Sequence, residues 1–161
     1  MINVPYPGDQ QYENRTASYW SVSAQLIPYC LVQPLSTGDV SKAVKTLVGD
    51  AACKDTKFTI RSGGHTTWAG SNNIDDGVTI DLGFMNITTL NSDTHIASIQ
   101  PGSGWGQVYE TLDPLGFTVA SGRGGPPLVS LAFLLEVGYR SLPTIPSLLT
   151  LPGGNSFFSA Q

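Results

Sequence analysis

Charged residues are scarce in this sequence, and long apolar runs are missing. Only 12% of the 161 residues are Asp, Glu, Lys or Arg, against roughly 25% in an average globular domain. The net charge is −4, so the chain offers no basic surface of the kind that binds nucleic acid. No apolar run approaches the ~18 residues of a membrane-spanning helix. We therefore expect neither a nucleic acid nor a membrane as a partner.

Residues that support metal, redox or hydrolytic chemistry are also few. The two cysteines, Cys30 and Cys53, could form one disulfide or remain thiols, and we favour a buried small residue for Cys30. The two histidines, His65 and His95, lack the third ligand that a zinc site would need. No Gly-x-Ser-x-Gly motif supports hydrolase chemistry. The sequence predicts no metal site.

What the sequence does contain is enough apolar material for a core, together with many turn residues. Hydrophobic residues make up 40% of the chain, which also has 18 glycines and 11 prolines, so a globular, loop-rich domain is expected. The first five residues do not resemble a secretory leader. Asn14 and Asn86 begin glycosylation sequons that would matter only in a secreted protein. The sequence does not decide whether the protein is secreted.

The first half of the chain alternates between strand and helix patterns. Residues 1–24 are polar, with Tyr12, Tyr19 and Trp20 as the only candidate anchors, and they form either an ordered segment that leads into the domain or a poorly packed arm. A buried strand is expected at 27–32. Ser36 or Thr37 is expected to cap a helix, with Asp39, three residues after Ser36, as the acid of a capping box. An apolar stripe with helical spacing follows. Strands are then expected at 57–61 and 78–82. The residues of the stripe are Val40, Ala43, Val44, Leu47 and Val48.

The sequence of the second half predicts a smaller unit that also contains both strands and a helix. Alternation of apolar and polar residues favours a strand at 95–100. A turn follows, and then a helix at 105–112 with Trp105 and Val108 on one face. A further strand is expected at 117–120.

The stretch Arg61–Gly70 carries the clearest functional signal. Adjacent glycines allow backbone conformations that side chains forbid, and successive N–H groups in such a turn form a nest for anions. Arg61 adds a permanent positive charge, and His65 adds a nucleophilic imidazole. These features favour a phosphate-bearing cofactor. The predicted cofactor-binding residues are Arg61, Ser62, Gly63, Gly64, His65, Thr66 and Gly70, with Gly102 and Gly122 as weaker candidates.

The string Arg-Ser-Gly-Gly-His, followed by Trp-Ala-Gly and Asp-Gly-Val-Thr-Ile-Asp-Leu, resembles FAD-linked oxidases of the vanillyl-alcohol-oxidase type. Within that family it is most similar to the fungal, berberine-bridge-enzyme-like branch. The resemblance runs from about Tyr12 to Arg123 and resumes at 153–159. It implies an α+β fold, namely a PCMH-type FAD-binding domain of two small α/β subdomains. It also implies that FAD is bound covalently through His65.

By the same resemblance, the full enzyme would oxidise an alcohol, sugar or secondary-metabolite substrate by hydride transfer to FAD, with oxygen as the second substrate. The catalytic base and the substrate pocket are expected in parts that this chain lacks, so the PCMH-type domain is expected to be incomplete. The alternative is a non-catalytic, truncated flavin-binding fragment or a gene-model artefact that shows no turnover.

The domain organisation follows from where the resemblance holds. We expect an N-terminal arm at 1–24, the FAD-binding domain at 25–125 and a resumed, truncated segment of that domain at 153–161. Residues 126–152 depart from the family pattern and are interpreted as an atypical insertion, through intron read-through or a frameshift. Sequencing of the spliced transcript tests this, because a message that still encodes 126–152 would contradict it.

Overall fold

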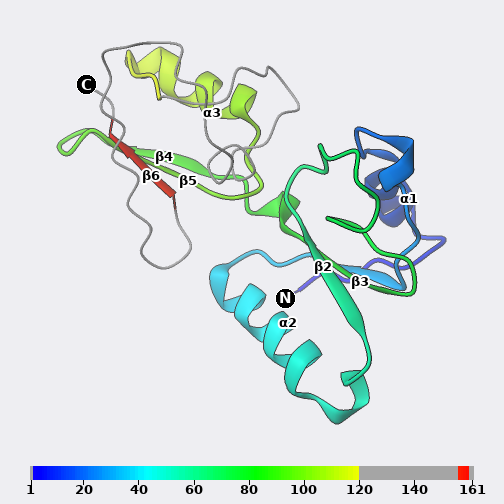
Figure 1. Cartoon of the computed structure of the whole chain (residues 1–161). Coiled ribbons are helices and arrows are strands. Elements are labelled where there is room, and N and C mark those ends of the chain that lie inside the picture. Colours follow the sequence, from blue (N-terminus) through cyan, green and yellow to red (C-terminus); the bar gives the residue numbers. More distant parts are fainter. Residues whose placement is uncertain (1, 120–155, 160–161) are drawn as a thin grey trace. The chain divides into compact units, whose positions relative to one another are not determined.

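The computed structural model describes residues 2–119 and 156–159. The chain divides into two compact units, Met1–Phe84 and Met85–Gln161 (Figure 1). Both units mix helices with strands, as the α+β prediction requires. The predicted insertion at 126–152 and the predicted site residue Gly122 lie outside the described residues. None of the helices in the described part has the length and apolar character needed to cross a lipid bilayer.

The first unit is built on a parallel three-stranded sheet in the order β1-β3-β2. Strand β1 (Cys30–Val32) and strand β2 (Lys57–Arg61) both pair with the central strand β3 (Gly77–Asp81). All five residues of β3 are buried, which is expected of a central strand in a parallel sheet. The predicted strands at 57–61 and 78–82 are confirmed to within one residue, whereas the strand predicted at 27–32 begins only at Cys30.

Helix α2 (Thr37–Gly49) connects β1 to β2 and begins as the sequence predicts. The Ser36 hydroxyl accepts a hydrogen bond from the Asp39 backbone N–H at 3.2 Å. The Asp39 carboxylate accepts a bond from the Leu35 N–H at 3.3 Å. The apolar stripe of this helix is only partly covered, because Ala43 is buried while Val48 is 69% exposed.

Replacing Ser36 by Ala should lower the free energy of unfolding by about 1 kcal/mol, because the first turn of α2 loses its N-cap acceptor. Urea denaturation of the full chain, followed by circular dichroism, measures this change. Ser41→Ala, on the exposed side of the same helix, serves as the control and should leave the midpoint nearly unchanged. Equal midpoints for both variants would contradict the capping role.

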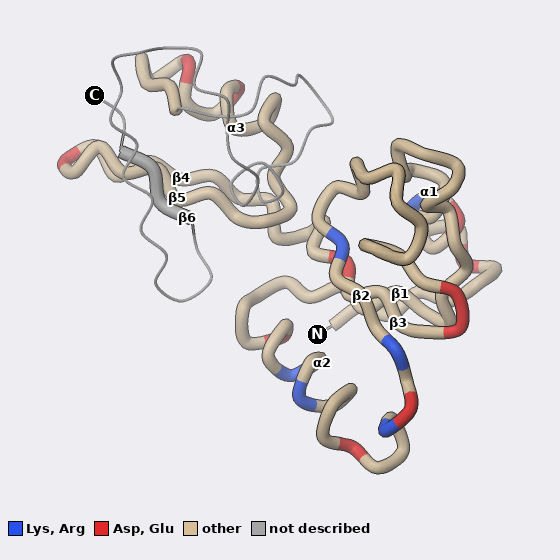
Figure 2. Tube along the Cα trace, viewed as in Figure 1, with Lys and Arg blue, Asp and Glu red and all other residues tan. Residues whose placement is uncertain are grey.

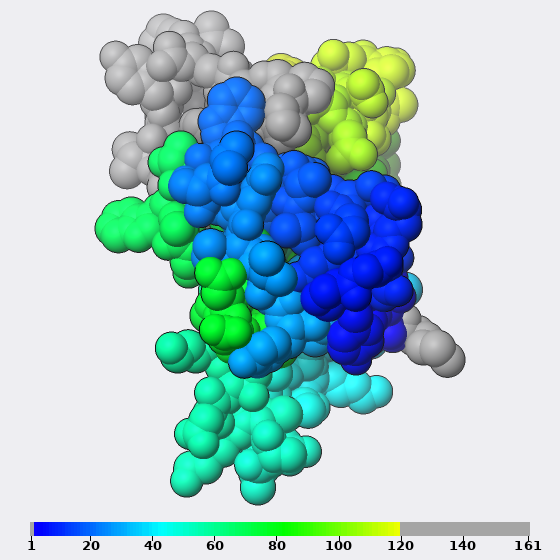
Figure 3. Space-filling model, turned by 90° about the vertical axis from the view of Figure 1, so that its right-hand side faces the viewer, coloured from blue at the N-terminus to red at the C-terminus, as the bar shows by residue number. Residues whose placement is uncertain are grey.

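The N-terminal segment is structured rather than a loose arm. Helix α1 (Gln10–Ala17) buries Tyr12, whose hydroxyl donates to the Pro28 carbonyl at 2.6 Å. A short 3₁₀ helix, η1 (Val22–Ala24), follows. In Figure 3 this segment, coloured blue, forms a continuous surface beside the green residues of the first unit. The poorly packed arm that we considered for residues 1–24 is therefore wrong for α1, because Tyr12 and Tyr19 anchor the segment in the core.

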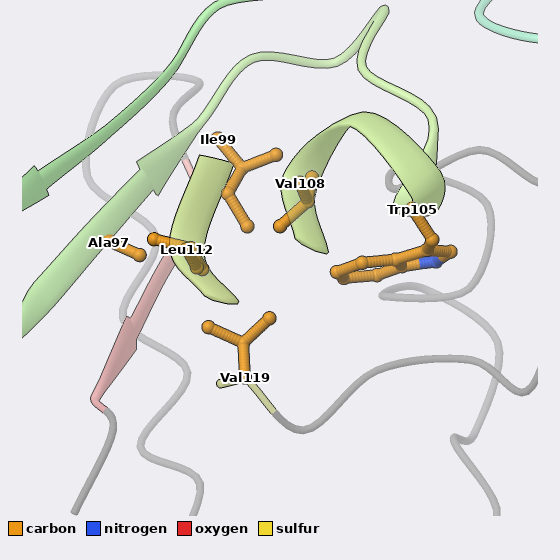
Figure 4. Packing of buried hydrophobic residues seen from close by; sticks show 6 residues of the cluster. All are labelled: Ala97, Ile99, Trp105, Val108, Leu112 and Val119. Atoms are coloured by element: carbon orange, nitrogen blue, oxygen red, sulfur yellow. The ribbon is translucent and has the colours of Figure 1, made fainter. Parts of the chain in front are cut away.

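The second unit combines an antiparallel sheet with one helix. Strand β5 (Ile96–Ile99) lies between β4 (Thr88–Asn91) and β6 (Ser156–Ser159). Helix α3 (Trp105–Leu112) has the predicted bounds. Figure 4 shows its apolar face directed at the residues of β5, with Val119 completing the cluster. The members of this cluster are Ala97, Ile99, Trp105, Val108, Leu112 and Val119.

Two details of this unit differ from the sequence predictions. Residues 117–119 form no strand, although Val119 is buried in the cluster. His95 precedes β5 instead of lying in it, with a φ of 52°, and its ring contacts Phe117 at 5.1 Å between centroids. Strand β4, which sequence periodicity did not reveal, pairs with β5 as a hairpin.

Candidate functional site

The predicted glycine turn follows β2 directly, so β2 determines where the turn begins. Arg61 is the last residue of β2 and pairs with Asp81 at the end of β3. Ser62 to Thr66, which we call the Gly-Gly-His turn, come next. The turn therefore lies at the carboxyl end of a parallel sheet, where cofactor loops are found in many α/β proteins.

Gly64 is the one residue of this turn whose conformation requires glycine. Its φ is +72°, in the left-handed region. A Cβ atom at this position would lie 2.8 Å from Tyr19 Cδ1 and 3.0 Å from Arg61 Nε. The absence of a side chain thus allows the backbone to rest directly on a buried aromatic ring and a guanidinium group.

Hydrogen bonds from the N-terminal segment fix the orientation of two peptide groups in the turn. The Ser62 carbonyl accepts from Arg15 Nη2 at 3.3 Å, and the Gly64 carbonyl accepts from the Trp20 N–H at 3.1 Å. The N–H of a trans peptide points opposite to its carbonyl. The amides of Gly63 and His65 therefore point away from the N-terminal segment. This is the arrangement that an anion-binding nest uses.

Arg61, which the sequence analysis expected beside the turn as a source of positive charge, lies beneath it. The side chain is fully buried. Nη1 donates to the Arg15 carbonyl at 2.6 Å, and Nη2 donates to Ser18 Oγ at 2.8 Å. The guanidinium also stacks on Tyr19, 3.7 Å from the ring centroid. The positive charge of Arg61 thus lies under the turn, and its hydrogen bonds hold the N-terminal segment in place.

A second arginine near the turn is paired with an acid. Arg15 Nε and Nη2 donate to the two carboxylate oxygens of Asp81 at 2.6 and 2.7 Å. Gln33 Nε2 and the Gly83 N–H also donate to this carboxylate, at 3.0 and 3.1 Å. In Figure 2 the charged residues, blue and red, are far outnumbered by the other residues of the first unit, drawn in tan.

The electrostatic balance of this buried group favours an anion beside it. Burial raises the pKa of the Asp81 carboxyl, but hydrogen bonding and charge from Arg15, with help from Gln33 and Arg61, outweigh burial and hold the pKa below its ordinary value. Burial and the neighbouring Arg15 lower the pKa of Arg61. Burial raises the pKa of Tyr19 to about 12. With two arginines and one carboxylate, the group carries one net positive charge under the turn.

His65 is half-buried, and its imidazole ring stacks on Trp20. The ring centroids are 4.8 Å apart and the planes differ by 19°. Trp20 is 63% exposed, whereas the nearby Tyr19 is buried. The ring of His65 therefore has an aromatic neighbour at the edge of the turn, which sequence analysis did not foresee.

The remaining predicted residues occupy less defined positions. Thr66 Oγ1 accepts from the Trp68 N–H at 3.1 Å. Gly70 is exposed with a φ of +84°. Gly102 belongs to the second unit, where its N–H donates to the Met85 carbonyl at 2.7 Å.

The predicted modification and metal sites can also be located. Asn14 and Asn86, the two sequon residues, are both exposed. Cys30 and Cys53 are free thiols of intermediate burial, and burial raises the pKa of the Cys30 thiol. Within the part of the chain that the structure describes, no group of three or more His, Cys, Asp or Glu residues could hold a metal ion.

Sequence reasoning singled out Tyr19 and Trp20 as anchors of the N-terminal segment but did not connect them with the turn, and it missed Arg15. Arg15, Tyr19 and Trp20 come from the N-terminal segment, more than forty residues before His65 along the chain. One signal could have identified Arg15, namely the acidic Asp81 at the end of an otherwise apolar strand. A buried acid requires a partner, and Arg15 is that partner.

A glycine turn at the end of a parallel strand, with a buried positive group below it, has the features of a site for an anionic cofactor. Comparison with known proteins identifies which one. Residues 28–131, more than half of the chain, match the FAD binding domain family. The chain belongs to this family, and its cofactor is FAD.

Individual relatives agree with this assignment. The FAD-dependent monooxygenase sdcF of Emericella nidulans is 48% identical over 128 residues, which cover 76% of this chain and 26% of that protein. The solved structure of 6-hydroxy-D-nicotine oxidase from Arthrobacter nicotinovorans is 27% identical, with a TM-score of 0.66, covering 76% of this chain and 26% of that one. The chain thus spans about a quarter of the length of the relatives it matches.

The fold prediction is confirmed by a more distant comparison. BBE-like 1 of Physcomitrella patens is 20% identical, with a TM-score of 0.63, and covers 80% of this chain and 27% of that one. At this identity the likeness concerns the fold alone. The expected PCMH-type FAD-binding fold, incomplete relative to these proteins, agrees with the observed arrangement of two mixed units.

Proposed function

We propose that this chain is the FAD-binding part of a flavin-dependent oxidoreductase and that His65 is joined covalently to the flavin. The observation that carries the proposal is the Gly-Gly-His turn above a buried group of net positive charge. An uncompensated buried charge is costly. A pyrophosphate against the turn would offset that cost and satisfy the outward amides at the same time.

The residues of the turn fit this cofactor in different ways. Gly63 and His65 would donate their backbone N–H groups to the pyrophosphate, with Arg61 supporting them from below. Ser62, Thr66 and Gly70 remain predicted contacts on the same loop. Gly102 in the second unit is a predicted contact as well, and so is Gly122.

The covalent step would form one bond between an imidazole nitrogen of His65 and the 8α-methyl carbon of the flavin. The imidazole N–H and one methyl C–H would be broken, and both hydrogens would leave as protons. The two electrons released would pass through the flavin ring to oxygen, which is reduced to hydrogen peroxide when it also takes up two protons. The protein's contribution is to position His65, because the redox chemistry belongs to the cofactor.

For the whole protein we propose oxidation of an alcohol, sugar or secondary-metabolite substrate, with FAD as the hydride acceptor and oxygen as the final oxidant. The name of the Emericella nidulans relative adds monooxygenation as a related possibility. A catalytic base would come from outside this chain. The second candidate is a flavin-binding fragment without turnover, which is favoured by the quarter-length coverage of the relatives.

The proposal predicts that the full chain, purified and denatured in acid, keeps a yellow chromophore and an added mass of one FAD. Replacing His65 by Ala should remove the covalent adduct completely, because the nucleophile is lost. Intact mass and the visible spectrum of the acid-denatured protein measure this. His95→Ala provides the control, since His95 is the only other histidine, and it should carry the adduct normally.

Either of two results would contradict the covalent link: a wild-type chain that releases all of its flavin in acid, or an adduct that survives in His65→Ala. Hydrogen peroxide production with candidate alcohols and sugars then separates the two candidate functions. Turnover by the 161-residue chain would support the enzyme, whereas bound flavin without turnover would support the fragment.

A further inference from the structure

Trp20 occupies a position that the proposed FAD site does not yet explain. Its indole ring is 63% exposed, so burial contributes little to holding it in place. Nevertheless the ring stacks on His65, with centroids 4.8 Å apart. A large exposed aromatic ring that contacts the one candidate nucleophile of the turn calls for a specific explanation.

The backbone around Trp20 is fixed at several points. The Trp20 N–H donates to the Gly64 carbonyl at 3.1 Å. On one side, the Tyr19 hydroxyl donates to the Asn72 carbonyl at 2.9 Å. On the other side, Ser23 Oγ donates to the Thr67 carbonyl at 2.7 Å. The segment that carries Trp20 is therefore bonded to the turn itself at Gly64 and to the loop that follows it at Thr67 and Asn72.

These bonds restrict how the stacked pair can move. The Trp20 N–H is bonded to the residue immediately before His65, so the backbones of the two stacked residues are held together. With its backbone fixed, an imidazole ring can vary only through its side-chain torsions. A nearly parallel aromatic neighbour on one face restricts those torsions, and a stack of this kind does not cover the ring edge that carries the nitrogens.

We propose that Trp20 is a positioning residue for the attachment of flavin to His65. Stacking on the indole holds the imidazole in one orientation before the cofactor arrives, so that less ordering is required when the nitrogen–carbon bond forms. Trp20 takes no part in the bond itself. The inference rests on the proposed covalent link at His65, and it adds a residue from outside the Gly-Gly-His turn.

The main test is the rate of covalent attachment after FAD is added to apoprotein made in riboflavin-starved cells. Loss of an aromatic pair predicts that Trp20→Ala attaches flavin roughly three- to tenfold more slowly than wild type. Trp20→Phe keeps an aromatic face and should recover most of the rate. Tyr29→Ala is the matched control, because this aromatic residue of the same unit is 57% exposed and lies outside the loop that carries His65, and its rate should be unchanged.

A second measurement reports on the stack without any cofactor. The ring carbon-bound protons of His65 should show an upfield ring-current shift in the NMR spectrum of the apoprotein, and Trp20→Ala should remove it. With only two histidines in the chain, His65→Gln assigns the signals. Near-native thermal stability of Trp20→Ala would separate loss of positioning from loss of folding.

The outcomes distinguish this inference from the proposed function. Slow attachment in Trp20→Ala, with rescue by Trp20→Phe and a lost ring-current shift, supports the positioning role. Normal attachment in Trp20→Ala overturns it and leaves the covalent link intact. If wild type forms no adduct at all, the proposed link has failed and the positioning role falls with it.

Discussion

Replacing Asp81 by Ala should lower the free energy of unfolding by roughly 3–5 kcal/mol, the cost of removing one partner from a buried ion pair. The carboxylate is 1% exposed and accepts both Nε and Nη2 of Arg15. Without it, the charge of Arg15 would lie beside Arg61 with no acid to balance either. Gln33 and the Gly83 N–H would also lose their acceptor.

Urea denaturation of the full chain measures this change. Asp55→Ala is the matched control, because Asp55 is an exposed aspartate in the same unit, and it should change stability by less than about 0.5 kcal/mol. Equal losses in the two variants would show that the Arg15–Asp81 pair contributes no more than a surface charge.

The effect of Asp81→Ala should also depend on pH in one direction. The folded protein holds the pKa of Asp81 below its ordinary value, so the ion pair stabilises the fold fully at pH values above the unfolded pKa of about 3.9. This contribution is lost as the pH falls through the lower, folded pKa. The difference in stability between wild type and Asp81→Ala should therefore be constant near neutral pH and shrink in acid.

Gly64→Ala is the second substitution with a large expected effect. A left-handed conformation costs a non-glycine residue about 1–2 kcal/mol. The new methyl group would also press on Tyr19 and Arg61, and such overpacking adds about 1–3 kcal/mol. Both neighbours are buried, so neither can move aside easily. We expect a total loss of about 2–5 kcal/mol together with weaker flavin binding.

Gly70→Ala separates the two causes. Gly70 also has a positive φ, but a Cβ there would meet no atom within 4 Å. Only the conformational cost of about 1–2 kcal/mol should appear. If Gly64→Ala were no more destabilising than Gly70→Ala in urea denaturation, the close approach of the turn to Tyr19 and Arg61 would not contribute to the loss of stability.

Sequence patterns predicted the elements that are specified by residues close together along the chain. The Ser36 cap, the strand at 57–61 and helix α3 follow from capping chemistry and periodicity, and the structure confirms them. The pair β4 and β5 was only half recognised. The sequence Thr88–Asn91 is short and mainly polar, and it becomes a strand through its pairing with β5.

In the candidate site, too, the residues with a local sequence signal were predicted and those without one were not. The Gly-Gly-His turn could be identified from adjacent residues, and its glycine at positive φ agrees with that reading. Its support could not be identified in this way, because Arg15 and Trp20 are brought to the turn by tertiary packing. The burial of Arg61 was missed for a similar reason. A charged residue at the end of a strand is usually exposed, whereas Arg61 is covered by the ring of Tyr19 and hydrogen-bonded to Arg15 and Ser18.

The N-terminal segment also changes where a minimal flavin-binding module begins. The family match starts at residue 28. The residues that pair with Asp81, stack on Arg61 and stack on His65 precede this start; they are Arg15, Tyr19 and Trp20. A protein trimmed to the matched region would keep every residue of the Gly-Gly-His turn and lose what holds it. Gene fusions, domain swaps and searches for related sequences should therefore include helix α1 and the residues that follow it up to Trp20.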